Sequence, residues 1–303
     1  MTKLLPKFEP RQVKLKDNKE ITIRSFDKGD VKKCLLLRKE VYGAAFSRKE
    51  WEWKFGENCP FYSDVLLAEE AGKVVGIQPM IVFPFVVDGK EKTSLMLLDL
   101  MVTPSWQAKG IFSAFIDILQ HEALKSVNFI YTFPNKRSLP GFINKFGWEI
   151  PFQPLLLSKV GRLRVLQDIT AAPESSYIGL KKDNAYLDWR YSRPGMSYAR
   201  IEKKTVLAWQ KRFGIRCGLL AEFDFAAYEK RIVDVKGLAG TAPLIFLINS
   251  KSRASEILKN YRFAKTLNLL RQFNLVVKVN PADTYLLKNL SQWQLSFGDV
   301  DVI

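Results

Sequence analysis

Apolar and polar positions in the first part of the chain follow two different periods. The alternation in Ile21–Arg24 predicts a strand, and apolar residues three and four apart over residues 31–42 predict a helix. A second, shorter helix is expected to begin at Ser47 and to run through Phe55. Residues 1–20 are polar and mixed in charge, so we expect a poorly ordered or edge segment there.

A run of strand patterns follows these helices. Val65–Glu69 and Lys73–Val87 are mostly apolar and rich in branched side chains, which is typical of strands. Asp88-Gly89 is a hairpin signal. The next apolar run, Ser94–Val102, is therefore expected to return as a single strand, so that the three strands pair antiparallel.

The helical period returns once more before the middle of the chain. Ile111–Ser126 has a clear apolar face and lies between the strands Ser94–Val102 and Phe129–Phe133. A strand, a helix and a second strand in this order form a βαβ unit. We expect its two strands to be parallel and its crossover to be right-handed.

The second half of the chain repeats part of the first. Glu50–Phe55 joins an acid, tryptophans and a base, and Ala185–Tyr191 has a similar series. Each stretch precedes a strand pattern by about ten residues, which indicates a tandem repeat of one unit. The further elements expected in this half are strands over Tyr198–Glu202, Val206–Lys211 and Pro243–Ile248, and a long helix over Ser252–Phe273.

Composition narrows the class of protein. The 303 residues are 47% hydrophobic and 26% charged, which is typical of a globular chain. The formal net charge is +16, with more of the excess in the second half, and this favours an anionic partner such as coenzyme A, nucleic acid or a membrane surface. The apolar runs are too short for a membrane span, and the first residues do not resemble a secretory leader. We therefore expect a cytoplasmic protein.

Cysteine and histidine usage excludes several kinds of site. Three widely separated cysteines fit neither a disulfide framework nor a zinc motif. His121 is the one histidine, and it lies in a predicted helix without a serine elbow elsewhere in the chain. A Ser-His-Asp hydrolase and a histidine-based metal site are therefore disfavoured, and no metal is expected.

One strand-to-helix connection carries a chemical signal. After the strand that ends at Val102, a proline-led turn is followed by Gln107-Ala108-Lys109-Gly110 and the start of a helix. Such a loop places backbone N–H groups side by side, and the helix N-terminus adds unpaired donors and a partial positive charge. Gly110 allows a tight turn, and Lys109 adds a point charge. The connection is able to bind a pyrophosphate, although a plain strand-to-helix turn uses glycine as well.

The series Val102-x-Pro104-x-x-Gln107-x-x-Gly110-Ile111-Phe112 resembles the coenzyme A signature of the GNAT acyltransferases. The order of elements over about residues 20–160 is similar too, and it ends with Lys145-Phe146-Gly147-Trp148 in a turn like that of the family. Two positions depart from the pattern. Phe112 stands where a small residue is usual, and a tyrosine that acts as acid in many GNAT enzymes is not found beside Phe142.

The resemblance implies a fold and a division of the chain. We expect an α/β (α+β) protein with the GNAT fold, which has a mixed, mostly antiparallel sheet and a βαβ unit at the cofactor. Residues 1–20 would be an extension, residues 21–160 the catalytic acyl-CoA-binding domain, and residues 161–303 a second, degenerate GNAT-like domain without the glycine loop.

The resemblance also implies binding residues for acetyl-CoA or another acyl-CoA. Backbone groups of Leu100, Met101 and Val102 would face the pantetheine arm and the thioester. The loop would bind the pyrophosphate, and Asn135 would lie near the cofactor or its leaving sulfur. The loop positions so assigned are Gln107, Ala108, Lys109, Gly110, Ile111 and Phe112.

Acyl transfer to an amine needs a base, an oxyanion donor and a leaving thiolate. Asp99 is the acid within an otherwise apolar strand, and burial raises the pKa of a carboxyl toward a useful range. We therefore name Asp99 as the candidate base and Tyr131, on the parallel strand, as the candidate acid. A paired structural aspartate and an aromatic core residue are the ordinary alternatives for these two positions.

The sequence thus predicts an N-acetyltransferase that acts on a small primary amine, with amino sugars as one class of acceptor. A tandem GNAT transferase that uses aminoacyl-tRNA is the alternative enzyme, and the basic second half would suit it, whereas the retained glycine loop argues against it. A non-catalytic binder of coenzyme A or nucleic acid is the third alternative, but no nucleic-acid motif is recognisable. The oligomeric state is left open.

Overall fold

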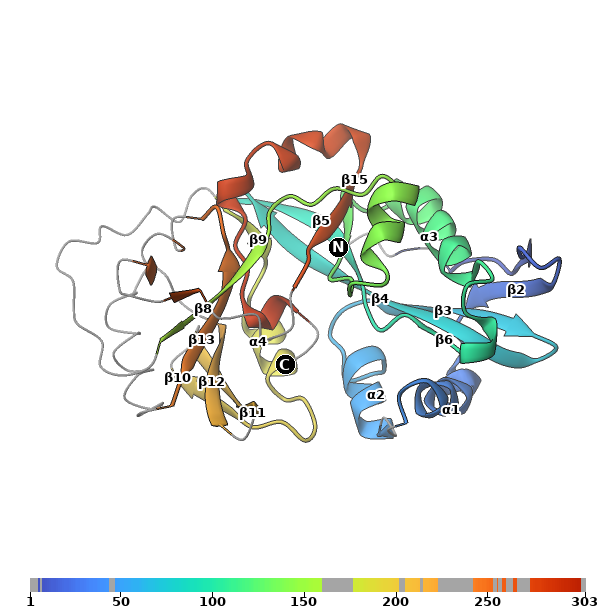
Figure 1. Cartoon of the computed structure of the whole chain (residues 1–303), viewed down its shortest axis with the longest axis horizontal. Helices are drawn as coiled ribbons and strands as arrows, with labels where there is room; N and C mark the ends of the chain where they lie inside the picture. Colours follow the sequence, from blue (N-terminus) through green and yellow to red (C-terminus); the bar gives the residue numbers. More distant parts are fainter. Residues whose placement is uncertain are drawn as a thin grey trace. The chain divides into compact units, whose positions relative to one another are not determined.

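The computed structural model describes most of the chain and divides it into two compact units (Figure 1). The described residues are 5, 7–43, 47–159, 177–201, 205–212, 215–222, 242–252, 255, 258, 259, 264, 265 and 273–300. The first unit comprises Met1–Pro84, Lys92–Glu149 and Val276–Thr284, and the second comprises Phe85–Glu91, Ile150–Leu275 and Tyr285–Ile303. Among the described helices, none is both long and apolar enough to cross a membrane.

A mixed sheet forms the centre of the first unit. Its neighbouring pairs are antiparallel from β1 to β4 and again at the far edge, whereas β5 and β7 run parallel. The helix α3 connects these two parallel strands, so the predicted mixed sheet and βαβ unit are confirmed. The strands in spatial order are β1 (Arg11–Lys14), β2 (Glu20–Ser25), β3 (Ser63–Glu70), β4 (Lys73–Val87), β5 (Lys90–Leu97), β7 (Phe129–Thr132) and β15 (Val276–Val279).

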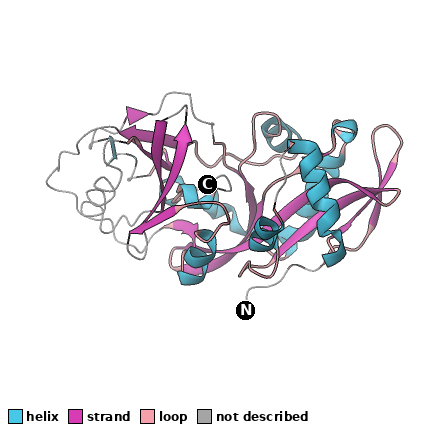
Figure 2. Cartoon of the chain, turned by 90° about the horizontal axis from the view of Figure 1, so that it is seen from below, coloured by secondary structure: helices cyan, strands magenta, loops and turns pink. Residues whose placement is uncertain are grey.

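Local signals set the ends of the three helices of this unit, which Figure 2 shows against the strands. The helix α2 (Arg48–Phe55) begins with a capping box, in which Ser47 Oγ accepts from the Glu50 amide at 3.1 Å. The helix α1 (Val31–Tyr42) ends at Gly43, which adopts the left-handed conformation common at such ends. The helix α3 spans Ile111–Glu122 and continues as a 3-10 turn to Lys125.

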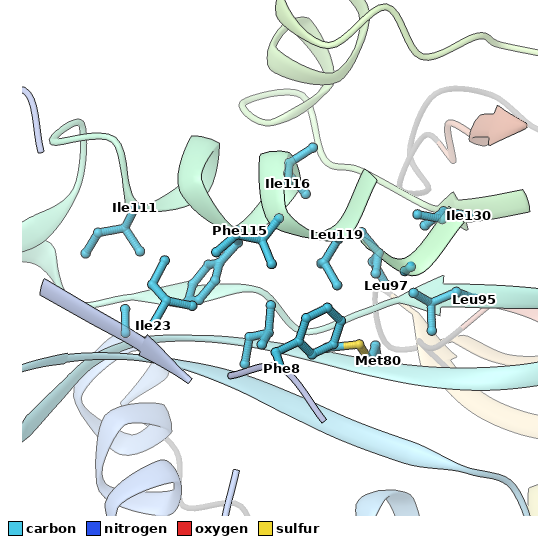
Figure 3. Packing of buried hydrophobic residues seen from close by; sticks show 14 of the residues in the cluster. Phe8, Ile23, Met80, Leu95, Leu97, Ile111, Phe115, Ile116, Leu119 and Ile130 are labelled. Atoms are coloured by element: carbon cyan, nitrogen blue, oxygen red, sulfur yellow. The ribbon is translucent and has the colours of Figure 1, made fainter. Parts of the chain in front are cut away.

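Both faces of the sheet are covered, and this explains the nearly continuous apolar runs of its strands. Along β3, Val65 and Leu67 face a core that includes Cys34 and Leu37 of α1 and Trp51 of α2. The alternate residues of β3 face α3, whose apolar side packs on the sheet (Figure 3). The residues of that second core include Phe8, Ile23, Leu66, Ala68, Met80, Leu95, Leu97, Ile111, Phe115, Ile116, Leu119 and Ile130.

The return strand expected over Ser94–Val102 is two strands. The strand β5 ends at Leu97, and β6 (Met101–Val102) pairs with β4, with an interruption at Asp99, whose φ is +47°. The buried amide of Gln78 braces this interruption because its Nε2 donates to Pro79 O at 2.8 Å and to Leu98 O at 3.1 Å. A single regular strand was wrong here, since one left-handed residue breaks the alternation of side chains.

The last strand of the first sheet comes from the end of the chain. The strand β15 pairs antiparallel with β7 and makes a further bridge from Val277 to Glu149. Lys278 donates through Nζ to the carbonyl oxygens of Phe146 and Gly147, at 3.1 Å each, and thereby ties down the Lys-x-Gly-Trp turn. More than a hundred residues therefore separate β15 from β7, the strand with which it pairs.

The second unit contains a mixed sheet with the same series of strand directions. Its pairs β10–β11, β11–β12 and β13–β8 are antiparallel, and β12–β13 is parallel. The pairs β10–β11, β12–β13 and β13–β8 have the same directions as β3–β4, β5–β7 and β7–β15 of the first sheet, as expected for a tandem GNAT-like arrangement. The elements are β8 (Pro154–Lys159), α4 (Asn184–Arg190), β10 (Tyr198–Ile201), β11 (Thr205–Arg212), β12 (Ile215–Glu222), β13 (Leu244–Asn249) and β14 (Ala264–Lys265), with β9 (Ile178–Leu180) paired to the end of β4.

The two units have exchanged their edge strands. In the first sheet β15 lies beside β7, although β15 follows the elements of the second unit in sequence. In the second sheet β8 lies beside β13, although β8 directly follows the elements of the first unit. Each unit thus depends on a strand from the other half of the repeat, and neither sheet is a continuous piece of sequence.

Two expectations for the second half need comment. The long helix over Ser252–Phe273 was wrong at Ala264–Lys265, which form β14 and pair with β8; most of the rest of this range lies outside the described residues. The boundary expected between residues 160 and 161 also lies outside them, so the predicted division into 21–160 and 161–303 stays a prediction. The end of the predicted extension, residues 11–14, forms the edge strand β1.

A buried ionic cluster holds the end of the second unit. Lys182 Nζ donates to Glu222 Oε2 at 2.6 Å and lies 3.0 Å from Asp299 Oδ1, while Tyr191 donates to Glu222 Oε1 at 2.7 Å. Burial raises the pKa of the Glu222 carboxyl above its usual range. The cluster joins β12 and α4 to the last 3-10 turn, Phe297–Asp299.

We expect the exchanged strand to be essential for the first unit. A chain that ends at residue 151 lacks β15 and leaves β7 with an open edge, which lowers stability and promotes association. Thermal unfolding and light scattering are expected to show a lower melting temperature and aggregation relative to the full chain.

The matched control joins residues 275–284 to that shortened chain through a flexible linker. This addition is expected to recover the melting temperature, because it restores the β7–β15 pairing and the Lys278 contacts. A shortened chain that is as stable and monomeric without β15 would contradict this account of the sheet.

Candidate functional site

The parallel strands β5 and β7 come apart at one point of the first sheet. Their pairing runs from Ser94–Phe129 to Leu97–Thr132, and Thr132 Oγ1 donates to Leu97 O at 2.8 Å at the last pair. Beyond Asp99 the chain continues as β6, which pairs with Gly76 and Ile77 of β4 on its other side. In the described part of the sheet no pairing of β6 with β7 follows, so no neighbouring strand uses the β7-facing backbone of β6.

The glycine loop lies at the end of this strand. Gln107 Nε2 donates to Val102 O at 3.1 Å, so the glutamine side chain fastens the loop to the end of β6. Ala108 and Gly110 both have positive φ, +63° and +112°, and α3 begins directly afterwards at Ile111. Gly110 O accepts the first helical bond, from Ala114 N at 3.0 Å. The N–H groups of the first helical turn are therefore unused by the helix and are suited to an anion.

Asp99 lies where the strands separate and faces two cations. Lys54 Nζ of α2 donates to Asp99 Oδ2 at 2.7 Å, and Arg38 Nη1 of α1 is 3.6 Å from the same oxygen. The side chain of Lys54 is only 5% exposed, while that of Asp99 is 20% exposed. The sequence argument relied on burial of Asp99 in an apolar strand and did not include these two cations.

Comparison with known proteins agrees with this geometry. A family model described as an acetyltransferase (GNAT) domain matches residues 22–151. These residues include the strands β3 to β7, the point where β5 and β7 separate, and the glycine loop. The chain carries a GNAT acetyltransferase domain. The GNAT assignment applies to these residues, and the cofactor of that family is acetyl-CoA. No curated protein matches the sequence.

Solved structures share the fold over both halves of the chain. A probable N-acyltransferase from Enterococcus faecalis V583 is 10% identical, with a TM-score of 0.63 over 87% of this chain and 74% of that one. A GCN5-related N-acetyltransferase from Kribbella flavida is 12% identical, with a TM-score of 0.58 over 86% and 72%. A putative acetyltransferase from Pyrococcus horikoshii is 15% identical, with a TM-score of 0.53 over 92% and 94%. At these identities the likeness concerns the fold alone.

The donor set of the GNAT domain fits the diphosphate of an acyl-CoA. The first turn of α3 supplies N–H groups. The left-handed conformations of Ala108 and Gly110 curve the loop, and successive backbone N–H groups in such a turn form a concave site for an anion. Lys109 adds a positive charge, although Asp17 partly balances it at 3.1 Å. The hydrogen bond from Lys109 lowers the pKa of the Asp17 carboxyl, so this acid is ionised at neutral pH.

Phe112, which departs from the family signature, turns away from the loop. Its ring makes edge contacts with Phe142 and Phe146, with centroids 5.2 and 5.8 Å away. A Cβ added at Gly141 would lie only 2.7 Å from the Phe112 ring. The large side chain is therefore accommodated between α3 and the π-helical turn Gly141–Lys145.

Tyr131 is buried on β7, whereas Asn135 is exposed just beyond it. Tyr131 is 2% exposed on β7, paired in register with Met96 and Val277, and its ring packs against Phe129 and Phe133. Asn135 lies just past β7 and is exposed, and its Oδ1 accepts from the amides of Arg137 and Ser138 at 2.9 and 3.0 Å. The Asn135 side chain therefore shapes the turn after β7.

The sequence analysis did not identify three residues that lie near the split, which is the point where β5 and β7 separate. Gln78 braces the break after β5, and Arg38 and Lys54 bring positive charge to Asp99. A signal existed for Gln78, because a lone amide inside the apolar run Lys73–Val87 needs buried partners. No signal existed for the two cations, since their approach to Asp99 depends on how α1 and α2 pack on the sheet.

The contact between Phe112 and Gly141 gives a test of this arrangement. Gly141→Ala is expected to destabilise the protein by about 1–3 kcal/mol, because the added methyl group overlaps the ring and forces a shift. Chemical denaturation of the single variants and of the double variant with Phe112→Leu measures the coupling. The loss should largely disappear in the Phe112→Leu background, and a loss of equal size in both backgrounds would contradict the described packing.

Proposed function

We propose that this protein transfers the acyl group of an acyl-CoA, acetyl-CoA in the first instance, to a small primary amine. The observation that carries the proposal is the parting of β5 and β7 at Leu97–Thr132 beside the glycine loop. This arrangement lets an extended ligand lie along β6 with its phosphates at the N-terminus of α3. An amine is then able to approach from the side of α1 and α2, where Asp99 lies.

Each residue has a defined part in this proposal. The cofactor supplies a thioester carbonyl as the acyl donor. Gln107–Phe112 bind its diphosphate, and the backbone of Leu100–Val102 aligns the pantetheine arm and offers an N–H group to the carbonyl oxygen as negative charge develops there. Asp99 accepts the ammonium proton of the acceptor, directly or through a water molecule. Lys54 and Arg38 hold Asp99 in its left-handed conformation.

The proposed reaction also needs an acid that protonates the leaving thiolate. Tyr131 was named for this role, and its ring lies within an aromatic row on β7. We retain Tyr131 as a candidate on the strand that borders the split. Amino sugars remain the first acceptors to test, followed by amino acids and polyamines.

Cofactor binding is tested by thermal stabilisation. Acetyl-CoA is expected to raise the melting temperature of the wild-type protein, because a ligand that binds only the folded state stabilises it. Gly110→Ala is expected to remove most of this shift, since φ of +112° strains any residue with a Cβ and the loop must rearrange.

Gly72→Ala is the matched control, because Gly72 also has a positive φ, +80°, but lies in the β3–β4 turn. It is expected to lower the melting temperature of the free protein while it leaves the acetyl-CoA shift intact. An undiminished shift in Gly110→Ala would refute the assignment of the loop.

Asp99 is tested by turnover on an identified acceptor. Asp99→Asn keeps the size of the side chain and removes its basicity, so turnover is expected to fall by roughly 10²-fold while acetyl-CoA affinity is nearly unchanged. Lys54→Met removes the adjacent ammonium, and the acidic limb of the kcat/KM profile is then expected to move to higher pH.

These two results separate a base from a structural acid. A structural Asp99 would make both variants less stable but would leave the position of the acidic limb unchanged. Normal turnover in a folded Asp99→Asn variant would end the proposal for this residue.

A further inference from the structure

The hairpin between β1 and β2 touches the glycine loop. Lys16 N donates to Lys109 O at 3.1 Å, and Leu15 N donates to Lys19 O at 2.8 Å, which closes the hairpin itself. A Cβ added at Gly110 would find the Lys16 Cγ at 3.8 Å and the Leu15 Cδ2 at 3.9 Å as its nearest neighbours. The turn of this hairpin is therefore fixed against the loop by a backbone bond and by side-chain contact.

Two of the positive charges at this contact lie near the buried ring of Trp106. Trp106, which is 9% exposed, has Lys19 Nζ at 4.9 Å and Lys109 Nζ at 4.8 Å from its ring centroid. Cation–π attraction holds both ammonium groups near the ring. The two charges nevertheless have the same sign, and a second anion near them would be favoured.

The single carboxylate of this contact balances only one of its cations. Asp17 Oδ2 lies 3.1 Å from Lys109 Nζ, so the loop lysine is already paired. Lys16 and Lys19 are exposed, and they come from the hairpin rather than from the loop. Among these four side chains there are three ammonium groups and one carboxylate, and the excess charge is that of the hairpin lysines.

We propose that Lys16 and Lys19 bind a phosphate group at the nucleotide end of the acyl-CoA. This inference rests on the proposed function, and it assigns to the N-terminal hairpin a part in cofactor binding. An acyl-CoA has a diphosphate and a separate 3′-phosphate. The amides at the start of α3 take one of these groups, and the two flexible ammonium side chains take the excess negative charge beside it.

The first test is calorimetric binding of coenzyme A and of 3′-dephospho-coenzyme A at a fixed salt concentration. In the double variant Lys16→Gln/Lys19→Gln, the Kd for coenzyme A is expected to rise by about tenfold or more, and binding is expected to depend less on salt. The melting temperature of the free protein should change little, because both side chains are exposed.

The matched control is the double variant Lys28→Gln/Lys125→Gln, which removes the same charge from two other exposed lysines. Lys28 is paired with Glu57, and Lys125 follows the opposite end of α3. Its Kd for coenzyme A is expected to stay within about twofold of wild type. An equal loss of coenzyme A affinity in both double variants would show that the effect comes from the net charge of the protein, and it would overturn the assignment.

Asp17→Asn tests the same assignment, with tighter instead of weaker binding of coenzyme A as the expected result. Removal of this carboxylate frees Lys109 and lowers the negative charge near the phosphate, so the Kd for coenzyme A is expected to fall by about threefold. Weaker binding in Asp17→Asn would contradict a phosphate at this place.

The two ligands identify which phosphate is bound. A loss confined to coenzyme A assigns the lysines to the 3′-phosphate, and an equal loss with 3′-dephospho-coenzyme A assigns them to the diphosphate. Unchanged affinity of the Lys16→Gln/Lys19→Gln variant for both ligands overturns the inference. Failure of the wild-type protein to bind coenzyme A would instead overturn the proposed function.

Discussion

One backbone constraint, the left-handed conformation of Asp99, creates the opening in the first sheet. A regular strand from Ser94 to Val102 would continue its parallel pairing with β7 and would leave no place for a ligand between them. The break at Asp99 instead transfers the chain to β4, where β6 pairs with Gly76 and Ile77. A positive φ costs an aspartate free energy, and the contacts of Gln78, Lys54 and Arg38 offset that cost.

The same break links the two helices on one face of the sheet to the point where β5 and β7 separate. Arg38 comes from α1 and Lys54 from α2, so the position of Asp99 depends on how both helices pack over Trp51 and Met101. The site is therefore held from two directions, by a buried amide within the sheet and by cations from the helical layer.

The first sheet depends on a strand that follows the elements of the second unit in the sequence. The GNAT domain ends in sequence near residue 151, but its sheet is completed only by Val276–Val279. In return, β8 completes the second sheet beside β13.

The sequence by itself determined the local elements, the βαβ unit and the glycine loop, because periodicity, caps and turn residues act over a few neighbouring positions. It also indicated the GNAT class, since Gln107 and Gly110 stand at fixed spacing within one loop. Gln78 was detectable as an amide in an apolar run, but its partners at Pro79 and Leu98 were not.

Only the tertiary structure decided the break at Asp99, the cations that face it, the inward turn of Phe112 and the origin of β15. Each of these depends on contacts between residues far apart in the chain, and neither hydrophobic period nor spacing records which distant segments meet. The hairpin lysines also depend on a distant contact. In the sequence Lys16 and Lys19 are indistinguishable from other surface charges, and only the hydrogen bond from Lys16 N to Lys109 O places them at the loop.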